Sequence, residues 1–236
     1  AAAQPWMIRP QGPANEFSAM EGTSVLNYNL QMERDIHSRA GYGPAFYIFP
    51  DSKLDNNQAL ELAGKLDLVN IIKEYGGRIM VVNPSSDKWQ EQDLENFRRL
   101  IGMGGSPTNV KVIGIGSGAT FVNRHLAATD LTGVIAGIVS IDGEPGKICK
   151  LPVPAFIGGK NAAKTAKPYQ STSDAAPADP LQKVVVNTDK KASLETLFAE
   201  AWDKVLSENY RYNNLYRTFY MSWGIDNPKS VKNFEL

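Results

Sequence analysis

Short apolar runs alternate with amphipathic helical patterns along most of the chain. Five runs have the length and composition of buried strands: 45–49, 78–82, 110–115, 134–141 and 153–157. Apolar residues at three- and four-residue spacing predict helices at 56–75, between Asp87 and Gly104, and from about 119 to 128. This alternation indicates an α/β fold, with a mostly parallel sheet and helices on both of its faces.

Two later segments depart from the alternation. Residues 158–180 are rich in Ala, Lys, Ser, Thr, Asp and Pro and show no period, so we expect a long surface loop or lid there. Residues 190–224 combine a strongly periodic helix with an aromatic-rich segment, and 217–224 resembles a strand. We expect residues 1–236 to form a single α/β domain.

Composition and charge remove several classes of function. Twenty-five basic and twenty-five acidic side chains cancel, which disfavours a nucleic-acid partner. The single cysteine, Cys149, and the two histidines, His37 and His125, exclude a disulfide scaffold and a multi-cysteine zinc site and leave little for a metal centre. No apolar run approaches the roughly 20 residues that span a bilayer. The start at Ala1 is what a signal peptidase would leave, so we expect a secreted or periplasmic protein.

The most informative stretch surrounds Ser117, where the third predicted strand runs directly into a helix. Gly116 and Gly118 flank the serine and Ala119 follows, as a tight turn that presents a nucleophile requires. Ile115 stands where the strict G-x-S-x-G pattern has glycine. In this reading the Ser117 hydroxyl attacks a carbonyl carbon.

An oxyanion formed by that attack needs hydrogen-bond donors. The Gly118 amide, at the start of the helix, is one candidate. The loop after the first predicted strand supplies a second candidate near Asp51 and Ser52.

The same letters permit a dinucleotide-binding interpretation. Gly114, Gly116 and Ala119 fit the G-x-G-x-x-A fingerprint, and Asp142 ends the next strand about 20 residues later. Such fingerprints usually follow the first strand of a domain, whereas two strand–helix units precede this one. Position in the chain therefore favours the nucleophile turn.

At this point the sequence resembles the α/β-hydrolase superfamily, in particular its secreted esterase and polyhydroxybutyrate-depolymerase-like branch. The resemblance covers roughly residues 40–160, and four stretches carry it: Phe49-Pro50-Asp51, Gly116-Ser117-Gly118-Ala119, Ser140-Ile141-Asp142-Gly143 and Pro154 to Gly159. It implies a serine hydrolase that cleaves small or polymeric carboxylic esters through an acyl-enzyme at Ser117, with no cofactor or metal.

The histidine that this resemblance requires after the nucleophile is missing. His125 lies eight residues beyond Ser117, about 12 Å along the same helix and leading away from the turn. His37 lies upstream of the nucleophile, outside the expected chain order.

The identity of the catalytic acid that the resemblance requires is also open. The family position corresponds to Asn161, and Asp174 and Asp179 lie farther along the same segment. Asp142 is an alternative that some members use, and we select it with Ser117 as the catalytic pair. An aspartate before glycine is also a common turn former.

Three explanations of the missing histidine remain. In the first, the chain is the N-terminal part of a larger enzyme or works with a second polypeptide, and the missing segment or partner supplies the histidine. In the second, it is a hydrolase fold that binds without catalysis. In the third, it is a dinucleotide-dependent oxidoreductase. The ending at 230–236, without a terminal helix or polar tail, favours the first, because such a sheet would lack its last strand.

Overall fold

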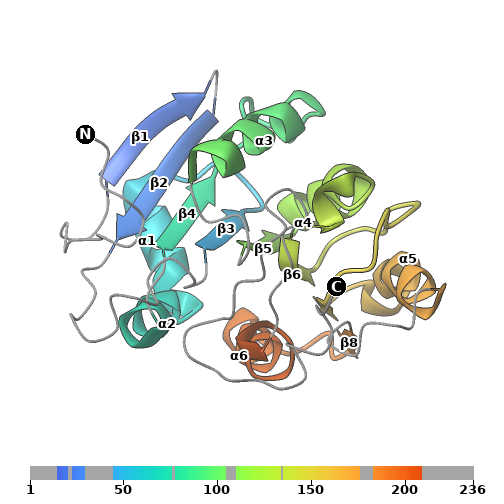
Figure 1. Ribbon diagram of the computed structural model, residues 1–236. Coiled ribbons are helices and arrows are strands. Elements are labelled where there is room, and N and C mark those ends of the chain that lie inside the picture. Colours follow the sequence, from blue (N-terminus) through green and yellow to red (C-terminus); the bar gives the residue numbers. More distant parts are fainter. Residues whose placement is uncertain are drawn as a thin grey trace, which may run out of the picture.

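The computed structural model describes residues 15–20, 23–29, 45–75, 78–104, 110–133, 135–175 and 183–208. Its centre is one eight-stranded sheet with the order β1-β2-β4-β3-β5-β6-β7-β8 (Figure 1). The strands are β1 (Asn15–Met20), β2 (Thr23–Asn29), β3 (Ala45–Phe49), β4 (Arg78–Val82), β5 (Val110–Ile115), β6 (Ile135–Ile141), β7 (Ala155–Gly158) and β8 (Val184–Asn187). The six strands from β4 to β8 in this order are parallel, while β1 and β2 add an antiparallel edge.

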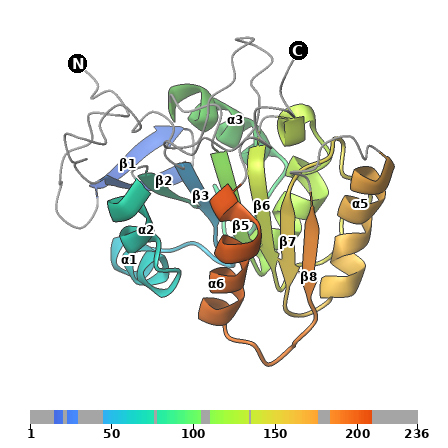
Figure 2. The same cartoon turned by 60° about the horizontal axis from the view of Figure 1, so that its bottom comes forward.

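Helices cover both faces of this sheet, as the apolar pattern predicts. They are α1 (Asn56–Lys65), α2 (Leu68–Tyr75), α3 (Gln92–Gly104), α4 (Ser117–Phe121), α5 (Ala162–Ala175) and α6 (Leu194–Lys204), with a π-helical turn η2 (Val122–Leu126) and 3₁₀ turns η3 (Asp130–Gly133) and η4 (Leu206–Glu208). One hydrophobic cluster joins the sheet to α3, α4 and α5, and a second joins it to α1, α2 and α6. Figure 2 shows α6 in front of the sheet, on the same side as α1 and α2. None of the described helices combines the length and the apolar character needed to cross a bilayer.

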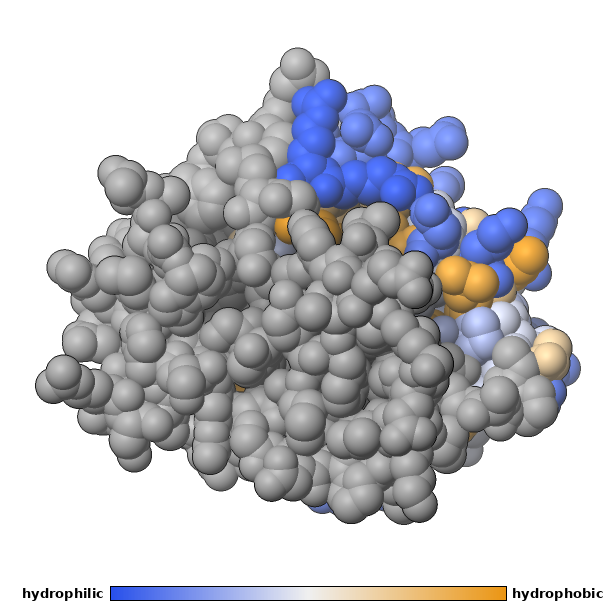
Figure 3. Space-filling model, in the orientation of Figure 1, coloured by the Kyte–Doolittle hydropathy of each residue, from blue (hydrophilic) through white to orange (hydrophobic). Residues whose placement is uncertain are grey.

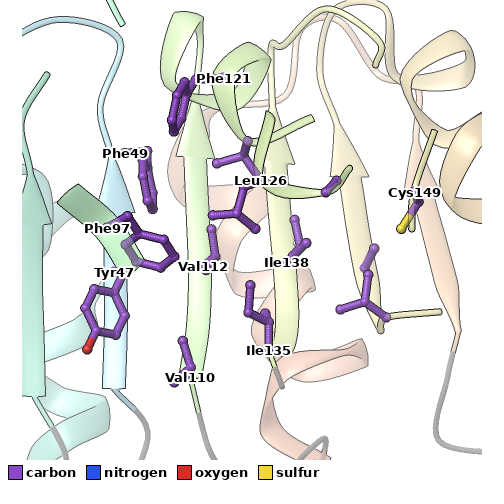
Figure 4. Packing of buried hydrophobic residues seen from close by; sticks show 14 of the residues in the cluster. Tyr47, Phe49, Phe97, Val110, Val112, Phe121, Leu126, Ile135, Ile138 and Cys149 are labelled. Atoms are coloured by element: carbon purple, nitrogen blue, oxygen red, sulfur yellow. The ribbon is translucent and has the colours of Figure 1, made fainter. Parts of the chain in front are cut away.

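Alternation along the strands decides which side chain enters which cluster. Tyr47 and Phe49 of β3 face α3, where Phe97 meets both rings edge-on at centroid distances of 5.2 and 5.0 Å (Figure 4). Phe46 and Ile48 point to the opposite face, toward α1 and α6. Hydrophilic side chains gather over the outer side of α3 (Figure 3). The fold is therefore held by burial on both faces of one continuous sheet.

The segment 158–180 corrects one prediction. We expected a loop or lid, but Ala162–Ala175 forms α5. Its buried face consists of Ala162, Thr165, Ala166 and Tyr169, which do have helical spacing. Three of these four side chains are small, and Pro168 lies inside the helix, so a search for large apolar residues misses the period. The predicted strand at 217–224 lies outside the described residues.

Parallel register places the predicted site residues at one edge of the sheet. Gly114 of β5 pairs with Phe49 of β3 on one side and with Ser140 of β6 on the other. The loops that follow β3, β5 and β6 therefore leave the sheet side by side, as ligand-binding loops of open parallel sheets do.

Candidate functional site

The turn between β5 and α4 bends at Gly116, one residue before the predicted position. Gly116 has φ 58° and ψ −123°, a backbone conformation that residues with a side chain adopt only under strain. Ser117 is the first residue of α4, and its side chain is exposed. The prediction that Ser117 occupies the tip of the bend is therefore wrong, although the turn itself is present.

Glycine spacing agrees with this backbone geometry. Gly114 and Gly118 lie two residues before and two residues after Gly116. A Cβ on Gly114 would come 2.6 Å from the Ala119 Cα atom, and one on Gly118 would come 2.0 Å from the Phe49 carbonyl oxygen. Small residues at these two positions are what a nucleophile turn needs around its central residue. When the G-x-S-x-G pattern is centred on residue 116, Gly114 and Gly118 match its two outer glycines and the Ile115 mismatch disappears. Gly116 then occupies the position of the nucleophilic serine.

Asp51 closes the turn from the loop after β3. The Ser117 N–H donates to the Asp51 Oδ1 atom at 2.7 Å, and the Ser117 hydroxyl donates to the Asp51 carbonyl oxygen. A Cβ on Gly116 would lie 2.2 Å from the same Oδ1 atom. In a nucleophile turn, the amide after the nucleophile stabilises the oxyanion. Here that amide already binds a carboxylate of its own chain.

The other predicted oxyanion donors do not converge on Ser117. Gly118 is buried against the backbone of Phe49 and Pro50. Ser52 is exposed and, with Asp51, lines a shallow cavity of about 260 Å³ on the α1 side of the turn. Ser117 lines a different groove, on the α4 side.

Asp142 repeats the role of Asp51 at the next turn. It directly follows β6 and has φ 56°, and its Oδ1 atom accepts a hydrogen bond from the Lys160 N–H at 2.8 Å. A Cβ on Gly159 would lie 2.1 Å from that oxygen. Its carboxylate is therefore directed to the turn after β7, and no hydrogen bond joins it to Ser117 within the described residues.

The alternative acids also lie apart from Ser117. Asn161, which has φ 58°, donates from its Nδ2 atom to the Glu144 Oε1 atom at 3.0 Å. Asp174 is exposed on α5, and Asp179 lies outside the described residues.

His125 is the single histidine in the described ranges. It belongs to η2, is half-buried, and places its ring 5.3 Å from that of Phe121. It follows Ser117 by eight positions along α4 and η2, so about two helical turns separate the two residues. The three residues directly after β8 are Thr188, Asp189 and Lys190, and none of these three is a histidine. His37 lies outside the described residues.

A buried polar network lies next to the turns that follow β5 and β6, and the sequence analysis did not predict it. The Asn123 side chain donates from its Nδ2 atom to the Ser140 hydroxyl (3.0 Å) and to the Glu144 carbonyl oxygen (2.9 Å), and accepts from the Tyr169 hydroxyl at 2.8 Å. Burial, and to a lesser extent Cys149, raises the pKa of Tyr169, so it stays a neutral donor. Asn123 stands between Val122 and Arg124, so no local pattern indicated that its side chain is buried.

The dinucleotide interpretation does not fit this geometry. A pyrophosphate on the fingerprint would need the free backbone amides at the start of α4. The Ser117 amide is bound to Asp51, whose carboxylate would repel a phosphate. The space beside Gly114 is filled by Ala119 rather than left open. In the described part of the chain, no three His, Cys, Asp or Glu side chains form a group that could hold a metal ion.

No protein-family model matches the sequence, and no curated protein matches it either. Comparison with solved structures does find the fold. A thermostable esterase aligns with a TM-score of 0.53 at 12% identity over 84% of this chain, which spans 63% of that esterase. An alpha/beta hydrolase from a Medee basin deep-sea metagenome library aligns with a TM-score of 0.52 at 15% identity, over 76% of this chain and 81% of its own.

A carboxylesterase from Mesorhizobium loti aligns with a TM-score of 0.50 at 8% identity, over 81% of this chain and 98% of its own. At these identities the likeness establishes architecture alone. The chain has an α/β-hydrolase fold, as its sequence motifs predicted, and what that fold does here depends on the site.

Proposed function

We propose that this chain is a non-catalytic binding domain built on the α/β-hydrolase fold. One observation supports the proposal above all others: glycine occupies the bend between β5 and α4, and Asp51 occupies the amide beside it. An acyl-transfer site needs a nucleophile at the bend and an open donor for the oxyanion. This turn has neither.

Electrostatics supports the same conclusion. The Asp51 carboxylate lies where negative charge would develop during attack on an ester. A second negative charge at that place is unfavourable, because like charges a few ångströms apart repel strongly. His125, about two turns away along the helix, is too distant to act as a base for Ser117.

A specific observation also favours a second candidate, the serine esterase that the sequence suggested. The Ser117 hydroxyl is exposed and lines a groove. Catalysis would require this hydroxyl to leave the Asp51 carbonyl oxygen and a second polypeptide, or residues outside the described ranges, to provide a histidine.

One pair of measurements separates the two candidates. The full chain, alone and in whatever complex it is purified with, is assayed with p-nitrophenyl acetate and with a fluorophosphonate probe, beside the Ser117→Ala variant. We expect no turnover above that variant and no covalent adduct. Hydrolysis that disappears in Ser117→Ala, or an adduct mapped to Ser117, would overturn the binding proposal and establish the esterase.

A further inference from the structure

A groove runs along α4 and η2, between this helical segment and the loop after β4. Six of its lining residues carry the argument: Lys88, Trp89, Ser117, Phe121, Arg124 and His125. We call it the α4 groove. Its volume is about 430 Å³, within the range of small-molecule sites.

The floor of the α4 groove is aromatic and rigid. The Trp89 Nε1–H donates to the Pro50 carbonyl oxygen at 3.0 Å, which fixes the indole in place. Its ring stacks on Phe121 with a centroid distance of 4.9 Å and an interplanar angle of 25°, and Phe49 backs it at 5.3 Å. Trp89 is only half-buried, so part of the indole is open to the groove. A fixed aromatic surface binds flat rings at little entropic cost.

Two cationic side chains lie at the rim of the groove. Lys88 and Arg124 are both exposed, and neither forms an ion pair with another described residue. Asp87 is the one carboxylate among the lining residues. Arg124 makes one long contact, from its Nε atom to the Pro145 carbonyl oxygen at 3.5 Å. Its guanidinium nitrogens therefore have capacity for an anion.

The Ser117 end of the groove disfavours negative charge. The Ser117 hydroxyl donates its proton to the Asp51 carbonyl oxygen, and the Thr120 hydroxyl donates to the Gly116 carbonyl oxygen at 3.3 Å. These hydroxyls thus present acceptor lone pairs, and the Asp51 carboxylate lies beside them. An anionic group is directed away from Ser117, toward Arg124.

We propose that the α4 groove binds a small aromatic carboxylate, with its ring on Trp89 and its carboxylate on the Arg124 guanidinium. The flat, half-exposed indole selects a planar body, and the unpaired cations select an anion. This inference rests on the proposed binding function, because it names the ligand class of the groove that Ser117 also lines.

The test is calorimetric titration of the full chain with cinnamate, and with cinnamamide as a neutral control of the same shape. We expect cinnamate to bind, and to bind more weakly as salt is added. Arg124→Gln should weaken cinnamate binding by about tenfold or more and leave cinnamamide unchanged. Trp89→Leu should weaken both probes.

Arg99→Gln is the matched control, because Arg99 is an exposed arginine on α3 that pairs with Glu95 outside the groove. It should leave both affinities unchanged. Arg124 is exposed, so its variant should fold, and circular dichroism checks this. Absence of heat with cinnamate at millimolar concentration would overturn the inference, as would equal affinities for the two probes or an unchanged Kd in Arg124→Gln. None of these results affects the ester-turnover assay, which tests the proposed function separately.

Discussion

Gly116→Ala is the sharpest test of the bend that defines this site. Alanine at φ 58° and ψ −123° is strained by roughly 1–3 kcal/mol. Its Cβ would also lie 2.2 Å from the Asp51 Oδ1 atom, so that carboxylate must move and its hydrogen bond with the Ser117 N–H is lost. That bond is exposed and contributes about 1 kcal/mol. We expect the free energy of unfolding in urea to fall by about 2–4 kcal/mol.

Gly64→Ala provides the control for this variant. Gly64 lies in α1, and no heavy atom comes within 4 Å of an added Cβ. The same chemical change should therefore stabilise the protein, by about 0.5–1 kcal/mol, because alanine loses less backbone entropy in a helix.

Asp51→Ala separates the two causes. In this background the Cβ of Gly116→Ala meets no carboxylate, so its cost should fall by about 1 kcal/mol, and the remainder reports backbone strain. A cost for Gly116→Ala below about 0.5 kcal/mol would refute the assignment of the bend to residue 116. Equal costs in both backgrounds would refute the claim that Asp51 fills the space above it.

Three further outcomes are expected from unfolding measurements. Asp142→Ala should lower the free energy of unfolding by about 1–2 kcal/mol, because the hydrogen bond from the Lys160 N–H is lost and alanine tolerates φ 56° poorly. Asp142→Asn keeps an acceptor and tolerates this conformation, so it should cost less than half as much. Tyr169→Phe should cost about 1–3 kcal/mol, because the Asn123 Oδ1 atom loses a buried donor, and equal stability would contradict the network. Burial lowers the pKa of Lys111 from 10.5 to about 7, so the folded chain binds fewer protons than the unfolded chain between these values. Stability should therefore rise with pH across that window, and Lys111→Met should show a shallower rise.

Hydrophobic periodicity in the sequence was sufficient to predict most strands of the sheet. The runs at 45–49, 78–82 and 110–115 are strands β3, β4 and β5 at the predicted residues, because parallel strands buried on both faces leave a continuous apolar signature. Helix α5 was not predicted, because three of its four buried side chains are small and Pro168 lies inside the helix. A helix whose buried face is mostly small residues leaves little hydrophobic period in the sequence.

The site divides along the same line. The glycines at 114, 116 and 118 predicted a tight turn from strand to helix, and an added Cβ at each of them would meet a neighbouring atom at less than 3.0 Å. The pattern centred on Gly116 has no mismatch, and glycine adopts a positive φ more readily than serine, so the letters themselves favoured Gly116 as the residue at the bend. Only the tertiary structure decided that Asp51, 66 positions earlier, accepts the hydrogen bond from the Ser117 amide. The local chain therefore determined that a turn forms, and contacts between segments far apart in the sequence determined that the Asp51 carboxylate binds the Ser117 amide beside it.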